Sequence, residues 1–493
     1  MKSLLHSLPQ PLLDTARLKT LEPVLARRAG ISLFELMSRA GHCAYEVLLH
    51  HWPDARRLMI LAGQGNNGGD AYVLASLALH DGLEVSLYRP GPPKTEDAKR
   101  AEEGYLALGG HCIEELPTCW QADLVVDGLL GTGLASPLRE PLATWQAALA
   151  RCPLPVLALD LPSGLDADSG AWQGQPWQAE QLVTFILPKV GLLTGQGRAS
   201  WRQASLASLG MKLAADEWPA LEAHRLASLQ GWLRPPLASA HKGHNGLALL
   251  VGGNLGMSGA IRLAGEAALR SGAGMVRVLT HPGSVAAVSA GRPELMVLGL
   301  ADPLGVALPK ARVLVLGPGL GQDDWAQAFF SWGLSQDGPK VLDADALNLL
   351  ARSPGPLPGA VLTPHPGEAA RLLGISTAEV EADRLAAVAE LARTYQAVVV
   401  LKGAGTLVSD GQQSRLLAVG GPAMASGGMG DLLSGIIGAL LAQGLPQWEA
   451  ACLGVALHGE AGELAGEGRP RGTLASDLLP FIRRLVNNAE LEP

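Results

Sequence analysis

A glycine-rich stretch with one carboxylate, Met424-Ala-Ser-Gly-Gly-Met-Gly-Asp431, leads into an apolar run over residues 432–441. A glycine-rich turn before a helix presents backbone N–H groups, and the helix dipole makes that position attractive to anions. We therefore expect Asp431 to be held ionised on the first helical turn, beside a place where phosphate would bind. This pairing favours phosphoryl-transfer or nucleotide chemistry. The alternative is that the glycines only permit close packing and Asp431 only caps the helix.

A second polar loop, residues 63–70, follows a predicted strand and contains the pattern G-x-G-x-x-G. That pattern is typical of dinucleotide-binding turns, and Arg89 after the next strand would favour a 2′-phosphate. However, Asp70 places a carboxylate where a pyrophosphate would lie. Asn66 and Asn67 also supply amide oxygens, which are suitable ligands for a hard cation. The sequence therefore favours a loop that binds a polar ligand and a cation over a hydride-transfer site.

Two more strand ends in the first half carry carboxylates, Asp127 and Asp160, each followed by a glycine-containing loop. Asn67, Asp127 and Ser163 are predicted to converge as oxygen ligands of a monovalent or divalent ion, which leaves Asp160 as an acid or base. The alternative is that both aspartates satisfy N–H groups of their own loops. Lys189 is either a further site residue or a surface charge.

In the second half, four strand ends carry reactive side chains or a glycine-rich backbone that a ligand can approach closely. Residues 317–321 form a rigid glycine turn suited to close approach by a ligand, and 343–345 carry two aspartates that either hold Mg²⁺ or, more commonly, cap a helix. His365 lies between two prolines in a predicted site-facing loop. Residues 402–406 place a lysine and open backbone where phosphate would lie. No Walker A sequence is present, so a nucleotide site here is of another design.

The elements that must position these residues are short apolar runs alternating with helical stretches. Asp14 and Ser32 precede spaced apolar positions and predict helices between residues 14 and 50. The strands predicted in the first half are 58–62, 83–88, 124–127, 156–160 and 182–185. Those predicted in the second half are 246–252, 275–280, 313–317, 340–343, 360–363 and 397–402. This alternation predicts two α/β domains with parallel sheets, in which ligands bind at the carboxyl ends of strands.

The length of 493 residues predicts at least two domains, and a change in composition places the boundary near residues 212–235. A net charge of −8 without a Lys/Arg cluster argues against nucleic acid as a partner. The five cysteines lack metal-ligand spacing, which indicates a reducing compartment. No signal sequence or membrane span is predicted. These features together favour a cytoplasmic enzyme.

Taken together, the motifs resemble those of the bifunctional NAD(P)H-hydrate repair enzymes over almost the whole chain. The first half resembles NAD(P)H-hydrate epimerase, through Asn-Asn-Gly-Gly-Asp, Gly-Thr-Gly and Asp-x-Pro-Ser-Gly. The second resembles ADP-dependent NAD(P)H-hydrate dehydratase, through Gly-Pro-Gly-Leu-Gly, Thr-Pro-His-Pro-Gly-Glu, Leu-Lys-Gly-Ala-Gly-Thr and the last glycine loop. The resemblance implies a Rossmann-like doubly wound domain over residues 1–215 and a ribokinase-like domain over 225–490.

The resemblance also implies site residues. K⁺ would bind Asn67, Asp127 and Ser163. In the first half the hydrated cofactor would contact Asn66, Asn67, Gly68, Gly69, Asp70, Gly131, Thr132, Gly133, Leu134, Ala135, Ser136, Pro137 and Asp160. In the second half it would contact Ala260, Gly319, His365 and Asp431. ADP, as co-substrate with Mg²⁺, would contact Lys402, Gly403, Ala404, Gly405, Thr406 and Gly430. The expected partners are small molecules and further copies of the chain, without nucleic acid or membrane.

In the mechanism implied by the resemblance, Asp160 exchanges protons near the hydroxyl-bearing carbon and interconverts the R and S hydrates. Asp431 then acts as base on the hydroxyl of the S hydrate as it attacks the terminal phosphoryl of ADP. Ala71 stands where the family usually has glycine, and Met429 replaces a small hydroxyl residue, so a side-chain hydrogen bond to phosphate is in doubt there. The alternatives are a ribokinase-like small-molecule kinase fused to a ligand-binding domain, a true dehydrogenase and a non-catalytic binding protein.

Overall fold

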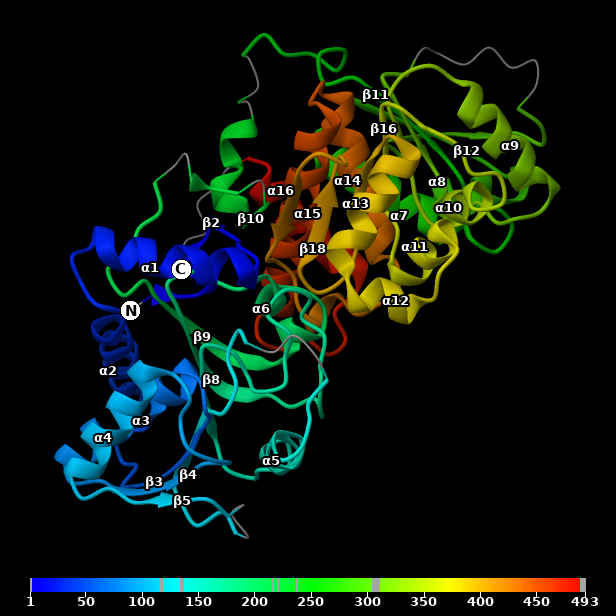
Figure 1. The fold of residues 1–493 in the computed structure, drawn as a ribbon. Helices are drawn as coiled ribbons and strands as arrows, with labels where there is room; N and C mark the ends of the chain where they lie inside the picture. The colour runs from blue at the N-terminus through cyan, green and yellow to red at the C-terminus, as the bar shows by residue number, and fades with distance from the viewer. Residues whose placement is uncertain are drawn as a thin grey trace. The chain divides into compact units, whose positions relative to one another are not determined.

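The chain forms two compact units, Met1–Glu222 and Ala223–Pro493, in the computed structural model shown in Figure 1. The structure describes residues 2–115, 119–133, 137–214, 217–219, 221–233, 235, 238–303 and 311–487. Among these residues, no helix is both long enough and apolar enough to cross a membrane.

The N-terminal unit is built on a sheet with the strand order β1-β9-β8-β7-β6-β3-β4-β5. All neighbours pair in parallel except β1 and β9, which are antiparallel. The strands are β1 (Lys2–Ser3), β3 (Arg57–Ala62), β4 (Glu84–Tyr88), β5 (Cys112–Ile113), β6 (Leu124–Gly128), β7 (Val156–Leu159), β8 (Ala179–Phe185) and β9 (Trp201–Ala207). The helices are α1 (Thr15–Arg28), α2 (Leu33–His51), α3 (Asn66–His80), α4 (Glu96–Ala107), α5 (Leu142–Leu149) and α6 (Val190–Leu193).

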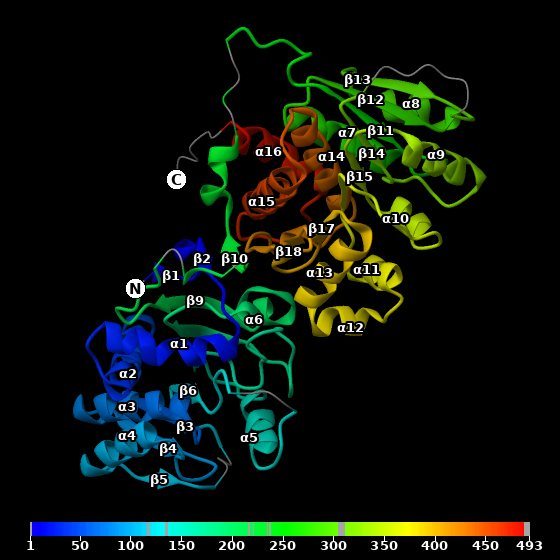
Figure 2. The same cartoon turned by 45° about the horizontal axis from the view of Figure 1, so that its top comes forward.

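Helices cover both faces of this sheet, because successive residues of each strand point to opposite sides. In β3, Leu58 and Ile60 belong to the core under α2, α3 and α4, whereas Met59 and Leu61 belong to the core under α5. Figure 2 shows α2–α4 and α5 on opposite sides of the strands. The unit is therefore doubly wound, as the sequence predicts.

The C-terminal unit has a mixed sheet that runs β13-β12-β11-β14-β15-β16-β17-β18-β19-β10. The first seven strands pair in parallel, and β18 and β19 continue the sheet antiparallel. In chain order the strands are β10 (Leu221–His224), β11 (Leu247–Val251), β12 (Met275–Thr280), β13 (Leu295–Gly299), β14 (Val313–Leu316), β15 (Lys340–Leu342), β16 (Ala360–Leu362), β17 (Val398–Leu401), β18 (Thr406–Ser409) and β19 (Ser414–Leu417).

Two helical layers enclose the C-terminal sheet. One face packs against α7 (Ser258–Arg270), α14 (Met429–Ala442), α15 (Gln447–Gly466) and α16 (Leu479–Leu485). The remaining helices are α8 (Val285–Ser289), α9 (Asp324–Ser335), α10 (Asp345–Leu350), α11 (Pro366–Leu373), α12 (Thr377–Ala382) and α13 (Arg384–Tyr395). Gly333 of α9 packs against Leu314 and Leu316, which face away from the α14 layer. The most apolar helix, α14, thus lies in the core, and its N-terminus stays at the carboxyl edge of the strands.

Every strand predicted from the sequence is a strand of the structure, and Asp14 and Ser32 cap α1 and α2 as predicted. The sequence reading missed the short strands β1, β5 and β10, as well as β9, β13 and the hairpin of β18 and β19. In β9, β18 and β19 polar residues interrupt the apolar positions. β13 is a short apolar run, Leu295–Leu298, and such a run does not by itself distinguish a strand from a buried helix.

Candidate functional site

In the N-terminal unit, the three residues predicted to bind a cation lie together at the carboxyl ends of β3, β6 and β7. Asp127 is fully buried and accepts hydrogen bonds from the Ser163 hydroxyl at 2.6 Å and the Ser163 N–H at 2.8 Å. Asn67 donates its amide to the Leu130 carbonyl at 2.9 Å, and the Leu130 N–H donates to the Ser163 hydroxyl. Burial raises the pKa of Asp127 to about 6, although the bonds from Ser163 oppose the shift.

The amide oxygen of Asn67 is buried and has no hydrogen-bond partner within the described ranges. A buried unpaired acceptor costs free energy unless something occupies the site with it. Together with the carboxylate of Asp127, it offers oxygen ligands of the kind that hard cations prefer. These residues therefore fit a bound K⁺.

Asp160 follows β7 in the left-handed backbone conformation, with φ of +62°. This conformation is unfavourable for aspartate, and such strain is concentrated at functional positions. One of its oxygens accepts hydrogen bonds from the Lys189 ammonium, the Thr184 hydroxyl at 3.3 Å and the Phe185 N–H at 3.2 Å. Lys189 is only 2% exposed and also donates to the Phe185 carbonyl at 2.9 Å. Lys189 is thus a buried partner of Asp160, and the reading of it as a surface charge is wrong.

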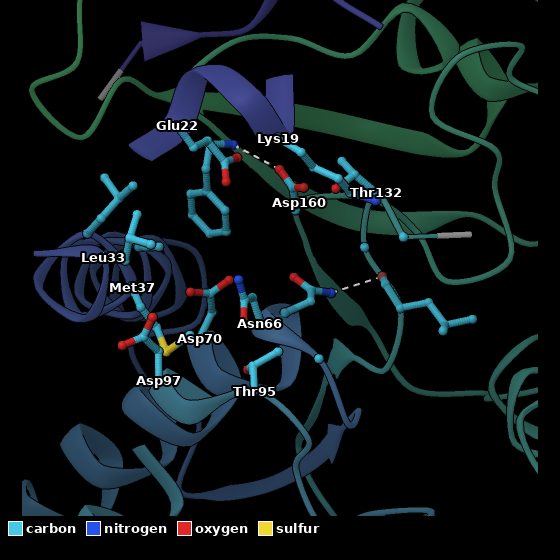
Figure 3. Close-up of a pocket in the computed structure, with 18 of the residues that line it drawn as sticks. Lys19, Glu22, Leu33, Met37, Asn66, Asp70, Thr95, Asp97, Thr132 and Asp160 are labelled. Atoms are coloured by element: carbon cyan, nitrogen blue, oxygen red, sulfur yellow. Dashed lines mark hydrogen bonds between the residues drawn. The ribbon is translucent and has the colours of Figure 1, made fainter. Parts of the chain in front are cut away.

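A cavity of about 550 Å³ lies in front of these residues. Of the positions predicted to bind the hydrated cofactor, those that line it are Asn66, Asn67, Asp70, Gly131, Thr132, Gly133 and Asp160. Figure 3 shows Asn66, Asp70, Thr132 and Asp160 around the same open space. Lys19 and Glu22 of α1 also line the cavity. They were missed from the sequence, because their positions depend on how α1 packs.

The other predicted residues of this half are placed differently. Gly68 lies behind the cavity wall, where a Cβ atom would be 1.9 Å from the Gly63 carbonyl oxygen, and Gly69 packs against Met37. Pro137 is described but does not line the cavity. Leu134, Ala135 and Ser136 lie outside the described residues.

Arg89, the residue that would favour a 2′-phosphate, forms ion pairs with Glu102 and Glu114. Its charge is therefore already neutralised by two carboxylates of the protein. This arrangement gives no support to the dehydrogenase alternative.

In the C-terminal unit, Asp343 at the end of β15 joins three elements. It accepts hydrogen bonds from the Lys402 ammonium and the Thr363 hydroxyl, both at 2.8 Å, and from the Ser434 hydroxyl of α14 at 2.5 Å. The Lys402 ammonium also lies 3.8 Å from the Glu368 carboxylate. Burial opposes the charged form of Lys402, but Asp343 and Glu368 outweigh it and raise the pKa of the lysine.

Asp431 lies in the first turn of α14, as predicted, but its pKa is not kept low there as expected. Burial, with the nearby carboxylates of Asp343 and Asp345, raises the pKa of Asp431 to about 7, against the opposing effect of Lys402. Desolvation and like charges outweigh the helix dipole because the side chain is mostly enclosed. A carboxyl group with this pKa can accept and release a proton near neutral pH.

The glycine positions of this half bring distant segments close together. Gly319 has φ of +58°, and a Cβ atom built there would lie 3.2 Å from the Cβ of Ala260. A Cβ atom at Gly430 would lie 3.2 Å from the Lys402 ammonium nitrogen. The predicted positions Ala260 and Gly319 are therefore neighbours, and so are Gly430 and Lys402.

The loop from Lys402 to Thr406 is a tight turn in which the Thr406 hydroxyl donates to the Gly403 carbonyl at 3.0 Å. Gly403 and Gly405 have φ of +144° and +61°. Buried Arg384 supports this turn by donating to the Lys402 carbonyl at 3.1 Å. Arg384 was missed from the sequence, because nothing near it in the chain marks it as part of a site. Ala404 lies between the two glycines.

Three further predictions concern side chains at helix starts. Asp345 lies in the first turn of α10 but does not cap it, because its carboxylate accepts the Gly321 N–H at 2.9 Å instead. His365 caps α11 through its Nδ1 atom and forms a capping box with Glu368. Burial and Lys402 lower the pKa of His365. Met429 is buried in the core, so its side chain is unavailable to a phosphate.

Comparisons with known proteins show the family of the chain. Residues 248–484 match the model of the NAD(P)H-hydrate dehydratase family, and residues 33–191 match that of the YjeF-related protein N-terminus. The bifunctional NAD(P)H-hydrate repair enzyme of Escherichia coli is 44% identical over 93% of this chain and 90% of its own length. That of Coxiella burnetii is also 44% identical, over 94% of this chain and 97% of its own. The chain belongs to the bifunctional NAD(P)H-hydrate repair enzyme family.

Membership confirms the predicted function, repair of hydrated NAD(P)H by an epimerase and a dehydratase in one chain. It also confirms the predicted fold class, a Rossmann-like unit followed by a ribokinase-like unit. Among solved structures, a Bacillus subtilis ADP/ATP-dependent NAD(P)H-hydrate dehydratase, co-crystallised with ATP and Mg²⁺, is 30% identical. The match covers 54% of this chain and 97% of that one, with a TM-score of 0.49.

Proposed function

We propose that the two reactions occur at the two sites described above, with Asp160 as an acid or base of epimerisation and Asp431 as the base of dehydration. The observation that carries the epimerase assignment is Asp160, strained and bonded to Lys189 at the wall of a 550 Å³ cavity. The corresponding observation for the dehydratase is Asp431, whose pKa is raised to about 7 at the start of α14. The domain limits that go with this assignment are 1–215 and 225–490.

In the epimerase site the hydrated cofactor binds along Asn66, Asp70, Thr132 and Asp160. Asn67, Asp127 and Ser163 would hold K⁺, which would supply a positive charge at this end of the cavity. The support for K⁺ is the unpaired oxygen of Asn67 and the buried carboxylate of Asp127.

In the dehydratase site the substrate binds near Ala260, Gly319 and His365, and the nucleotide binds along Lys402–Thr406 and Gly430. Asp431 removes the proton from the substrate hydroxyl, whose oxygen then attacks the terminal phosphoryl of the nucleotide. The bond from that phosphorus to the bridging oxygen breaks, and the nucleotide leaves one phosphate shorter. Lys402 and the N–H groups at the start of α14 stabilise the charge that develops on the phosphoryl oxygens. Phosphate then leaves the ring, together with a proton from the neighbouring carbon, and NAD(P)H is restored.

We further propose that the nucleotide is ADP, which is converted to AMP and phosphate, and that Mg²⁺ arrives with its phosphates. The protein is proposed to act in the cytoplasm as a homo-oligomer on small-molecule substrates. The absence of a Lys/Arg cluster from the sequence supports the exclusion of nucleic acid.

The decisive experiment follows the recovery of NADH absorbance from a mixture of both hydrate epimers with ADP and Mg²⁺. The wild type should convert the whole mixture. Asp160→Asn should stop after the S epimer is consumed, and Asp431→Asn should give no NADH while still interconverting the epimers. A phosphorylated product that accumulates, or an Asp431→Asn variant with the wild-type rate, would overturn the assignment.

The K⁺ proposal predicts that the epimerase rate falls when K⁺ is replaced by Li⁺ at constant ionic strength. Li⁺ is much smaller, so the same oxygens cannot contact it equally well. Asp127→Asn should lose this dependence, whereas the dehydratase rate on the S epimer should not change. An epimerase rate that is equal in the two salts would contradict K⁺ at this site.

A further inference from the structure

The carboxyl group of Asp70 lines the epimerase cavity and is not engaged by the hydrogen bonds that hold Asp160. Asp70 is 9% exposed, and in the part of the chain that the structure describes its carboxyl group has no hydrogen bond or ion pair. Figure 3 shows it pointing into the cavity, with Asp160 and Glu22 across the open space. A buried carboxyl without donors is costly and is retained where it contacts a ligand or takes part in chemistry.

Asp70 and Asp160 share one cavity but have opposite surroundings. Asp160 accepts three hydrogen bonds, one of them from an ammonium group. Burial raises the pKa of Asp70 well above its ordinary value, and the charges of Asp160 and Glu22 add to the shift, whereas Lys189 opposes it. The charged groups that line the cavity around Asp70 are Lys19, Glu22, Lys94, Asp97, Asp160 and Lys189. Asp70, whose protonated form is favoured, thus shares the cavity with a carboxyl group held by three donors, and this geometry suits a general acid placed opposite a general base.

We propose that Asp70 is the general acid of epimerisation, that Asp160 is its general base, and that Lys189 is the positioning residue that holds Asp160. This inference rests on the proposed epimerase site. It assigns the proton transfer at the hydroxyl oxygen to Asp160 and the proton transfer at the ring nitrogen to Asp70.

The proton positions follow from the chemistry of the hydrate. Water adds to an enamine with its hydroxyl on the carbon bonded to nitrogen, so the hydrate is a cyclic hemiaminal. Asp160 takes the hydroxyl proton, the carbon–oxygen bond becomes a carbonyl, and the carbon–nitrogen bond breaks. Its electron pair goes to the ring nitrogen, which takes the proton of Asp70. After rotation of the aldehyde, the nitrogen attacks its opposite face, its proton returns to Asp70, and the new alkoxide takes the proton from Asp160. No other reactant is consumed.

The first test is Asp70→Asn, which keeps the shape of the side chain but removes the acid. Its kcat for epimerisation should fall at least about 100-fold with little change in KM, because a general acid contributes about 10²- to 10⁴-fold. Asp81→Asn, at the exposed end of the same helix, is the control and should match the wild type. The dehydratase rate on the pure S epimer reports that each variant chain is folded and competent.

The pH profile separates an acid from a residue that only binds. Wild-type kcat should fall at high pH as Asp70 loses its proton, and this basic limb should be absent from the residual activity of Asp70→Asn. Lys189→Met should lower kcat, and Lys189→Arg should recover most of the loss, because a cation again donates to the Asp160 carboxyl group. A purely structural role of Asp70 would lower activity equally at every pH, and that outcome would overturn its assignment. Equal losses in the two Lys189 variants would overturn the positioning role of Lys189.

Isotope labelling tests the ring-opening step. Epimerisation in H₂¹⁸O within a single turnover should leave the original oxygen in the inverted hydrate, because the hydroxyl oxygen never leaves its carbon. One ¹⁸O gained per inversion would overturn ring opening. If the wild type does not epimerise at all, the proposed function fails. If it does, and Asp70→Asn is as fast while Glu22→Gln is slow, only the present inference fails.

Discussion

At the scale of single residues, the sites are defined by carboxyl groups whose proton affinity is set by burial. Asp431, Asp70 and Asp127 all have raised pKa values, and in each case desolvation is the largest cause. Reactive carboxyls need this tuning, because an ordinary aspartate is a weak base at neutral pH. The tuning also makes activity and stability depend on pH in predictable directions.

The dehydratase reaction should depend on the ionised form of Asp431. Because its pKa is about 7, kcat should rise about tenfold per pH unit well below 7 and level off above it. The measurement is NADH formation from the pure S epimer at saturating ADP between pH 5 and 9. A profile without an inflection near neutral pH would argue against Asp431 as the base.

The same buried carboxyl should lower stability as pH rises. The folded pKa of Asp431 lies above the unfolded value near 4, so the native state binds more protons between about pH 4 and 7, and the free energy of unfolding falls across that window. Asp431→Asn removes this dependence. Chemical denaturation should therefore find the variant increasingly more stable than the wild type from pH 5 to pH 8, and a constant difference would contradict the buried, titrating carboxyl.

At the scale of elements, helix α14 connects the site with the core. Its first turn carries Asp431, Ser434 bonds to Asp343, and Gly435 lies against α7, where a Cβ atom would be 2.0 Å from the Ala264 carbonyl oxygen. The Ala264 carbonyl belongs to the backbone of α7, which cannot move aside as a flexible side chain can. The position of Asp431 therefore depends on how closely α14 approaches α7.

Gly435→Ala should push α14 away from α7, with a loss of about 2 kcal/mol of stability. Dehydratase kcat should fall with it, because Asp431 moves with the helix, while epimerisation is retained. Gly104→Ala, in the open middle of α4, is the matched control and should stabilise by up to about 1 kcal/mol. Thermal unfolding and the two activity assays measure both effects. Equal stability of the two variants would refute the close contact between α14 and α7.

At the scale of the whole molecule, two compact units each have their own core and their own predicted site. The residues proposed for each chemistry belong to one unit alone: Asp70, Asp160 and Lys189 to the first, and Asp343, Lys402 and Asp431 to the second. Nothing in either site requires that both be intact in one chain.

An equal mixture of Asp160→Asn and Asp431→Asn chains should therefore convert both hydrate epimers completely to NADH, although neither variant does so alone. The epimerase of one chain supplies the dehydratase of the other through solution. Absorbance recovery with ADP in excess measures the result. A mixture that stops after the S epimer is consumed would mean that the two sites must cooperate within one chain.

The sequence alone determined the central parallel strands of both sheets, the caps of α1 and α2, and the family, because these depend on local patterns: apolar runs, capping residues, and glycine and aspartate motifs at strand ends. It placed the three predicted cation ligands correctly at neighbouring strand ends, since parallel strands end at one edge of the sheet.

Only the tertiary structure decided the protonation of the carboxyls and the partners of the site residues. The prediction for Asp431 failed because its pKa depends on burial and on Asp343, which is far away in sequence. Lys189 acquired its role through contact with Asp160, and Arg384 through contact with the loop after β17. Burial and distant charge are properties of the packed chain, and local sequence does not encode them directly.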